Sequence, residues 1–110
     1  MAKDDYFVLV YRILTRLYAY FKAGEKPDIT TFNADILGIN YGYFINIMES
    51  LYNEGYIKGI SIFPAINGQC DIKVIDLKIT QSGIEYLQEN TMMKKAHNFI
   101  KGVTEIIPGF

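Results

Sequence analysis

The spacing of apolar residues changes from a helical period to a strand period at Gly55. Before Gly55, apolar side chains recur every three or four residues, whereas residues 56–66 and 72–79 are alternating runs rich in Ile and Val. Asn67-Gly68 lies between these runs, and Asn-Gly in that position is a strong signal for a β-hairpin. Helical spacing returns after Thr80. The sequence therefore predicts an α+β chain in which a hairpin interrupts a series of helices.

The first helix is predicted from an apolar stripe over residues 7–21. Asp4 or Asp5 can cap its start, and Gly24 can end it in the left-handed conformation. Pro27 prevents its continuation. Because residues at three- and four-residue steps share one helix face, we expect the following side chains in the core: Phe7, Val10, Tyr11, Leu14, Leu17, Tyr18 and Phe21.

Two helices joined by a tight turn are predicted next. Gly38 can end a short helix that Thr30 or Thr31 caps, and Asn40 can cap a longer helix that follows. The longer helix runs to residue 53 or 54 and buries a stripe formed by Phe44, Ile47, Met48 and Leu51. Two helices connected by a short turn containing Gly form a helix-turn-helix.

The rest of the chain is predicted to complete the hairpin and add two helices. The second strand run changes phase between Val74 and Ile75, which predicts a β-bulge there. Thr80 can cap a further helix, and Asn90-Thr91 separates that helix from a last one. The last helix is expected to continue to Pro108-Gly109 with its own stripe: Met92, Met93, Ala96, Phe99, Ile100, Val103, Ile106 and Ile107.

The order helix, helix-turn-helix, hairpin and helix is the winged-helix arrangement. IMESLYNEGYIKGI (residues 47–60) resembles the end of a recognition helix entering the wing, and LKITQSGIEYLQEN (77–90) resembles the phrase that closes many bacterial wings. Together with the tail NTMMKKAHNFIKGVTEIIPGF, the chain resembles the YjcQ family, small winged-helix proteins associated with bacteriophages and prophages. The resemblance implies a winged helix-turn-helix with a C-terminal helical extension, in a DNA-associated phage or prophage regulator.

We expect residues 1–90 to form the winged-helix domain and residues 91–110 to add the C-terminal helix. The apolar stripe of this helix exceeds what a three-helix domain needs, and burying such side chains is strongly favourable. Two arrangements remain open, namely packing on the same chain against the first helix and a homodimer interface. The candidate interface residues are Met93, Ala96, Phe99, Ile100, Val103 and Ile107.

The predicted recognition helix lacks the cations that favour DNA binding. Residues 28–57 contain no Lys or Arg but four acids, a local charge of −4, and affinity for the duplex comes largely from cations that meet phosphates. The candidate DNA-binding residues are the outward side chains near the start of this helix and the lysines of the wing: Tyr41, Tyr43, Asn46, Ser50, Lys58, Lys73 and Lys78.

Two functions therefore remain. One is a transcriptional regulator that binds double-stranded DNA weakly, with wing lysines on phosphates and Asn46 able to pair with adenine. The alternative is a protein-interaction module that keeps the winged-helix fold without DNA binding and has an unknown protein partner. A net charge of −1 provides no field that would draw the whole chain to nucleic acid.

No motif indicates an enzyme or a cofactor. The sequence has no Gly-rich phosphate loop, no H-E-x-x-H and no nucleophile elbow. A single Cys and a single His exclude an intramolecular disulfide and a zinc cluster of Cys and His. We interpret Cys70 as a packing residue and His97 as a residue of a polar helix face.

The N-terminal residues do not predict export or membrane insertion. Asp4 and Asp5 stand where a secretion signal needs positive charge. Arg12 and Arg16 interrupt the apolar stretch that follows. We therefore expect a cytoplasmic protein without a membrane partner.

Overall fold

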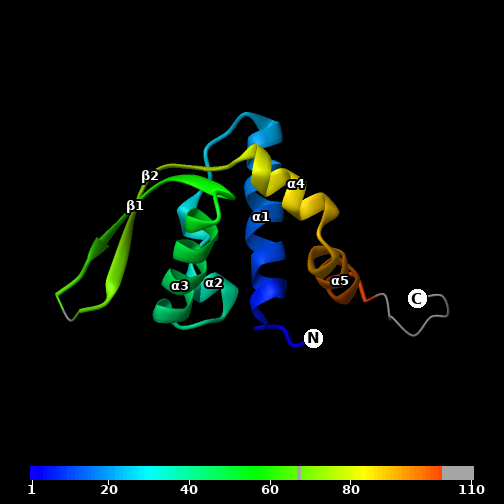
Figure 1. Cartoon of the computed structure of the whole chain (residues 1–110), viewed down its shortest axis with the longest axis horizontal. Helices are drawn as coiled ribbons and strands as arrows, with labels where there is room; N and C mark the ends of the chain where they lie inside the picture. The colour runs from blue at the N-terminus through cyan, green and yellow to red at the C-terminus, as the bar shows by residue number, and fades with distance from the viewer. Residues whose placement is uncertain (67, 103–110) are drawn as a thin grey trace.

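The computed structural model describes residues 1–66 and 68–102, and within them the chain is α+β. Five α-helices and one antiparallel pair of strands occur in these residues, an arrangement compatible with a winged helix (Figure 1). A 3-10 turn, η1, precedes α2. In chain order the elements are α1 (Tyr6–Ala23), η1 (Ile29–Thr31), α2 (Ala34–Leu37), α3 (Tyr41–Asn53), β1 (Ile57–Pro64), β2 (Cys70–Ile79), α4 (Gln81–Glu89) and α5 (Thr91–Ile100).

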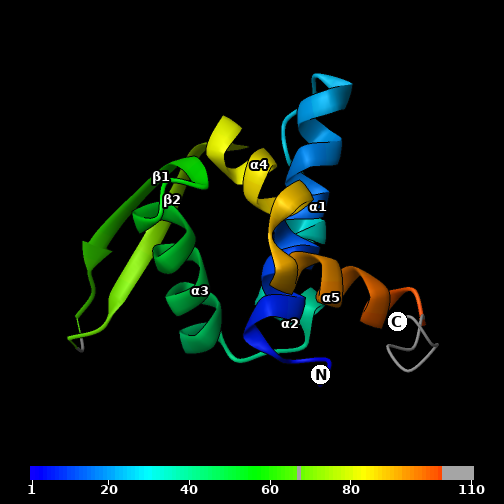
Figure 2. The same ribbon diagram turned by 45° about the vertical axis from the view of Figure 1, so that its right-hand side comes forward.

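Helix α1 lies in the middle of the molecule and is buried on two sides. The α2–α3 pair lies on one side of α1, and α4 and α5 lie on the other (Figures 1 and 2). The predicted stripe was therefore too narrow, because it assumed one covered face. The buried side chains of α1 are Val8, Leu9, Val10, Ile13, Leu14 and Leu17.

The prediction that Phe21 lies in the core is wrong. Its side chain is 50% exposed, because the last turn of α1 extends past the elements that cover the rest of the helix. Tyr11 and Tyr18 are only half-buried and pack at the margin of the core. The predicted end of α1 is confirmed, since Gly24 adopts a left-handed φ of 72°.

The α2–α3 segment follows the predicted turn but uses a different first cap. Asn33, rather than Thr30 or Thr31, caps α2 and accepts a hydrogen bond from the Ile36 amide at 3.0 Å. The two threonine hydroxyls instead donate to Asp28, which caps η1. The rest of the prediction for this segment is confirmed: Gly38 is left-handed, Asn40 caps α3, and the four stripe residues of α3 are buried together with Ile45.

The hairpin projects away from the helices and contains a bulge near the predicted place (Figure 1). Lys58 pairs with Lys78 and Ile60 pairs with Val74, so Gly59 alone lies opposite three residues of β2. Gly59 has a φ of 86°, and an added Cβ would lie 1.8 Å from the backbone oxygen of Asp76. Only glycine can be accommodated where the β1 backbone approaches the β2 backbone this closely. Asn67 of the predicted Asn-Gly turn lies outside the described residues.

Helix α4 begins at the predicted cap, Thr80, and α5 begins at the predicted break, where Asn90 is its cap. The Gly83 amide donates to the Thr80 hydroxyl at 3.0 Å, and the Met92 amide donates to the Asn90 side chain at 2.8 Å. Gly83 permits close packing, because an added Cβ would lie 2.2 Å from the Tyr56 carbonyl oxygen. No helix among the described residues is long and apolar enough to cross a membrane.

Helix α5 packs on α1 of the same chain, beside the first half of that helix (Figure 2). Met93 and Ala96 are completely buried there, so assigning them to a dimer interface is wrong. Phe99 and Ile100 are 37% and 41% exposed. The helix ends at Ile100 and Gly102 has a left-handed φ of 77°, so it does not continue unbroken toward Pro108. Val103 and Ile107 lie outside the described residues.

Candidate interaction surface on α3 and the hairpin

The start of α3 and the far end of the hairpin border a cleft of about 490 Å³. The lining is polar and aromatic, with one carboxylate and no Lys or Arg. It contains several of the side chains that the sequence predicted for DNA reading. The lining residues are Asn40, Tyr41, Gly42, Tyr43, Ile45, Asn46, Glu49, Gln69 and Cys70.

Tyr41 connects α3 to the hairpin across this cleft. Its hydroxyl donates a hydrogen bond to the carboxylate of Asp71, which also accepts from the Ile72 amide at 2.8 Å. The bond to this carboxylate is the main cause that raises the pKa of Tyr41 to about 12. The same bond, followed by the Ile72 amide, lowers the pKa of Asp71. Tyr41 is therefore a protonated hydroxyl already engaged within the protein.

Two further predicted reading residues are engaged with α1 and the residues before it. The Tyr43 hydroxyl donates to the Asp4 carbonyl oxygen at 2.8 Å. The Ser50 and Tyr6 hydroxyl oxygens are hydrogen-bonded at 2.8 Å. Asn46 is exposed, and the structure records no hydrogen bond of its side chain among the described residues. Of the four reading candidates, only Asn46 is thus positioned for an outside partner without breaking an internal bond.

The three lysines of the hairpin are exposed but are not gathered around the start of α3. Lys58 and Lys78 face each other at the base of the hairpin, near the last turn of α3. A helix of this length spans roughly 20 Å, so these two lysines lie far from Tyr41 at the start of α3. Lys78 also forms an ion pair with Asp76 at 3.7 Å. Lys73 lies farther along β2, opposite Ser61.

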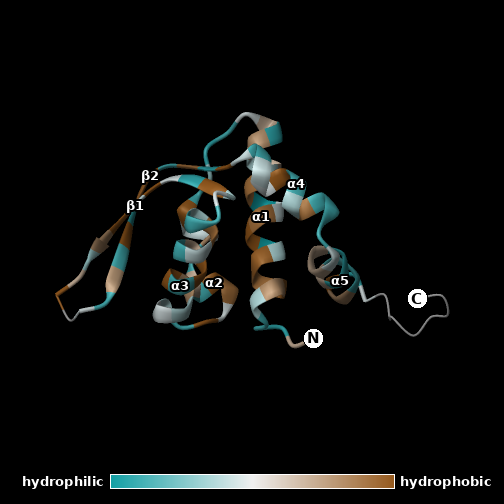
Figure 3. Ribbon diagram, in the orientation of Figure 1, coloured by the Kyte–Doolittle hydropathy of each residue, from teal (hydrophilic) through white to brown (hydrophobic). Residues whose placement is uncertain are grey.

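The far end of the hairpin is apolar and exposed. The side chain of Phe63 is 42% exposed, and that of Ile66 is fully exposed. Hydrophobic residues are visible there, beyond the helical body, in Figure 3. The distribution of charged residues does not point to Phe63 and Ile66. The apolar run around Pro64 is the sequence feature that could have predicted them. Exposed apolar side chains that form a contiguous patch are typical of protein-binding surfaces.

A tyrosine cluster beside the C-terminal half of α3 was also missed. The rings of Tyr56 and Tyr86 are stacked with centroids 4.4 Å apart and an interplanar angle of 22°. The hydrogen bond between Tyr6 and Ser50 joins α1 and α3 beside them. These residues come from different elements, and nothing in the local sequence pattern brings them together.

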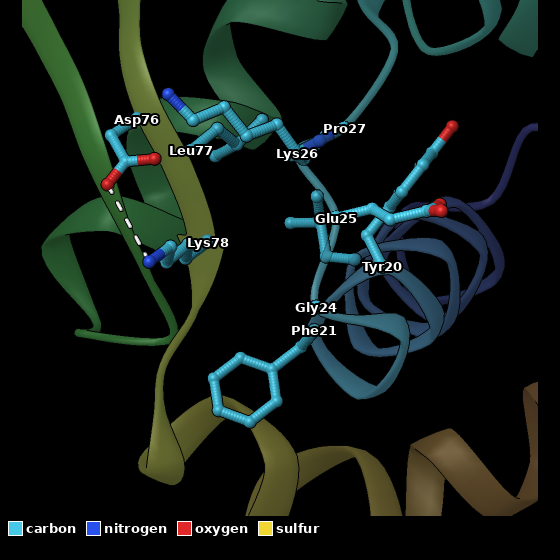
Figure 4. Close-up of a pocket in the computed structure, with 10 residues that line it drawn as sticks. Tyr20, Phe21, Gly24, Glu25, Lys26, Pro27, Asp76, Leu77 and Lys78 are labelled. Atoms are coloured by element: carbon cyan, nitrogen blue, oxygen red, sulfur yellow. Dashed lines mark ion pairs between the residues drawn. The ribbon is translucent and has the colours of Figure 1, made fainter.

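A smaller cleft of about 280 Å³ lies between the end of α1 and β2 (Figure 4). Phe21 stands at its edge, and Lys26 and Leu77 lie close together above it (Figure 4). The charges around it are mixed, because Glu25 and Asp76 accompany Lys26 and Lys78. This mixture favours no particular ligand.

Cys70 and His97 lie on opposite sides of the molecule. Cys70 is exposed at the start of β2, so its interpretation as a packing residue is wrong. His97 is exposed on α5, and its Nδ1 lies 2.6 Å from the Tyr11 hydroxyl oxygen. The hairpin and α5 are separated by the helical body, so these two residues cannot act as a nucleophile and base (Figure 1). The described residues include no cluster of His, Cys, Asp and Glu suited to a metal ion.

Comparison with known proteins identifies one family. The family model described as YjcQ protein matches residues 11–106, which is most of the chain. No curated protein and no solved structure matches the chain.

Proposed function

We propose, from the premise that the chain belongs to the YjcQ protein family, that it is a winged helix-turn-helix protein that binds another protein. In this proposal α2 and α3 form the helix-turn-helix around Gly38, and the β1–β2 hairpin is the wing. Helix α5 is the C-terminal extension. Fold alone does not assign function, so the surface chemistry decides between protein and DNA.

The observation that carries this proposal is the chemistry of the exposed face of α3. The helix contains no Lys or Arg, and Tyr41, Tyr43 and Ser50 already form internal hydrogen bonds. A duplex carries about one negative charge per 1.7 Å of its axis, so an approach by this face begins with repulsion. Reading bases with these hydroxyls would also cost the bonds that join α3 to β2 and to α1.

The apolar end of the hairpin supports a protein partner. Phe63 and Ile66 offer apolar area next to the polar cleft at the start of α3. An apolar centre with a polar rim is the usual composition of a protein interface. A phosphate group makes no favourable contact with such apolar side chains.

Site-specific photocrosslinking tests the proposal in the host cell. Benzoylphenylalanine replaces Ile66 or Asn46 in the interaction surface, and Ala19, on the exposed side of α1, serves as the control position. We expect a discrete protein adduct from Ile66 and Asn46 but not from Ala19. Adducts to nucleic acid alone, or the same protein adducts from all three positions, would overturn the proposal.

Weak DNA binding within a phage or prophage regulator is the second candidate. It is favoured by the order of elements, which matches that of DNA-binding winged helices, and by the exposure of Lys58 and Lys73 on the hairpin. Phosphate contacts by these lysines would position the protein without reading sequence. For this second candidate function we also propose a cytoplasmic location and a homodimer.

A further inference from the structure

The tyrosine cluster links α1, α3 and α4 through the hydrogen bond between Tyr6 of α1 and Ser50 of α3 and through the stacked rings of Tyr56 and Tyr86. A cleft borders the stacked pair, and we call it the tyrosine groove and define it by its lining residues: Tyr56, Ser82, Glu85, Tyr86, Glu89 and Asn90. The rings of Tyr56 and Tyr86 are half-buried, so part of each ring remains accessible.

The tyrosine groove has a volume of about 360 Å³ and lies between Tyr56 and α4. Tyr56 and Tyr86 line it as a stacked pair, and Glu85 and Glu89 stand beside them. Neither α3 nor α4 contains Lys or Arg. The cleft therefore combines aromatic faces with carboxylates and no competing cation from these helices.

The ionisation of the tyrosines is consistent with negative charge along the groove. Burial is the main cause that raises the pKa values of Tyr43, Tyr56 and Tyr86. Glu54 raises those of Tyr56 and Tyr86 further, and Asp4 and Asp5 raise that of Tyr43, because a carboxylate opposes formation of a nearby phenolate. Glu54 thus adds negative charge near the stacked Tyr56–Tyr86 pair.

We propose that the tyrosine groove binds an arginine-containing segment of a partner protein. A guanidinium group stacks on the exposed part of the Tyr56–Tyr86 pair while its N–H groups bind the carboxylates of Glu85 and Glu89. Arginine fits better than lysine, because its planar head can stack on a ring and bind a carboxylate with two parallel hydrogen bonds. This inference rests on the proposed function, since it names the chemistry of the protein partner.

Binding of a defined probe tests the proposal with the full chain. The probe is a fluorescein-labelled peptide with three arginines separated by Gly-Ser, and its lysine counterpart is titrated in parallel at low salt. Fluorescence anisotropy measures affinity, and amide chemical shifts locate the site. We expect tighter binding of the arginine peptide, with shifts concentrated in residues 50–56 and 82–90.

Matched variants separate a specific site from general charge attraction. We expect the Glu85→Gln, Glu89→Gln double variant to weaken arginine-peptide binding about fivefold, from the loss of two exposed ion pairs. The Glu25→Gln, Asp35→Asn double variant changes the net charge equally at exposed positions outside the groove and should bind like the wild type. Tyr86→Phe keeps the stacking ring and should bind the arginine peptide like the wild type. Tyr86→Ser removes the ring and should reduce the affinity for this peptide by a few-fold.

Three results would overturn the inference: equal weakening by both charge-matched double variants, shifts that spread over the surface, or equal affinity for the lysine peptide. None of them tests the proposed function, which depends on crosslinks at Ile66 in the hairpin and at Asn46. Conversely, a nucleic acid adduct there would refute the proposed function whether or not the peptide binds.

Discussion

Glycines at different positions of this fold are required for different physical reasons. Gly38 and Gly59 both have positive φ, but an added Cβ meets nothing within 4 Å at Gly38 and meets the Asp76 backbone at Gly59. Gly38 is therefore needed for its conformation alone, whereas Gly59 is needed for its conformation and its lack of a side chain. The sequence identified Gly38 from its place between two helices, but Gly59 is explained only by the crossing of the strands.

The two glycines should respond differently to the same substitution. We expect Gly38→Ala to lower the free energy of unfolding by about 1–2 kcal/mol, the cost of a left-handed L-residue. Gly59→Ala should cost about 4 kcal/mol or more, because the β2 backbone must also move. Urea denaturation measures both. Equal losses for the two variants would contradict the close approach at Gly59.

The bond between Tyr41 and Asp71 should make stability depend on pH at both extremes. The pKa of Asp71 is lowered in the folded chain, so its contribution exists above the ordinary value of 3.8 and is lost as pH falls through the folded value. The pKa of Tyr41 is raised from 10.0 to about 12, so its contribution exists below 10.0 and is lost as pH rises toward 12.

Replacing Tyr41 by Phe tests this dependence. We expect Tyr41→Phe to be less stable than the wild type by a constant amount from about pH 5 to 9, with the difference shrinking below about pH 4 and above about pH 10. Tyr52→Phe, at another exposed tyrosine of α3, is the matched control and should follow the wild type. A difference that does not change with pH would mean that the hydrogen bond does not form.

At the scale of elements, the position of α1 between two groups of helices explains most of the packing. A helix covered on two sides buries more residues than an amphipathic stripe predicts. The same position provides α5 with a partner inside the chain, which is why Met93 and Ala96 are buried. The large apolar side chains that remain exposed on the described part of α5 are those of Phe99 and Ile100, in its last turn.

Two variants of α5 distinguish its packing from self-association. Met93→Ala should lower the free energy of unfolding by about 2–5 kcal/mol, because it removes a completely buried side chain. Phe99→Ser with Ile100→Ser should change it far less. If these two residues form the predicted homodimer interface, sedimentation gives a dimer for the wild type and a monomer for the double variant. A monomeric wild type would contradict that interface.

At the scale of the whole molecule, acidic and basic residues are unevenly distributed. The α2–α3 segment and α4 contain only acids among their charged residues. The hairpin carries Lys58, Lys73 and Lys78 together with Asp71 and Asp76, and the exposed side of α5 carries Lys94 and Lys95. The lysines are spread over distant elements rather than gathered at the start of α3. Such a surface can attract phosphates without holding a duplex in one orientation.

Salt dependence measures how many phosphates the chain can contact. We expect any binding to a random duplex to be weak, with a log–log slope against salt of about −2 to −4, because two to four lysines can contribute. Lys73→Gln should weaken it equally for all sequences. Tight, sequence-selective binding that survives moderate salt would contradict the assignment to protein interaction.

The sequence by itself determined the local structure of this protein. Gly38, Asn40, Thr80 and Asn90 end or cap helices as predicted, because each acts on backbone groups within about four residues. The cap of α2 was predicted wrongly, because Asp28 accepts hydrogen bonds from both threonine hydroxyls. At α1, Asp5 stands at the N-cap position but its side chain makes no cap hydrogen bond. The absence of cations from α3 was equally visible in the sequence.

Only the tertiary structure decided the surfaces. Tyr41 meets Asp71, Tyr6 meets Ser50 and Tyr56 meets Tyr86 across long stretches of chain. The periodicity of the sequence does not predict these contacts, because they depend on how the elements are placed around α1 and on the bulge at Gly59. The same placement buries Met93 and leaves Phe21 exposed, although each lies on a predicted apolar stripe. An apolar stripe predicts which side chains share a helix face, but only the tertiary structure determines which element covers that face.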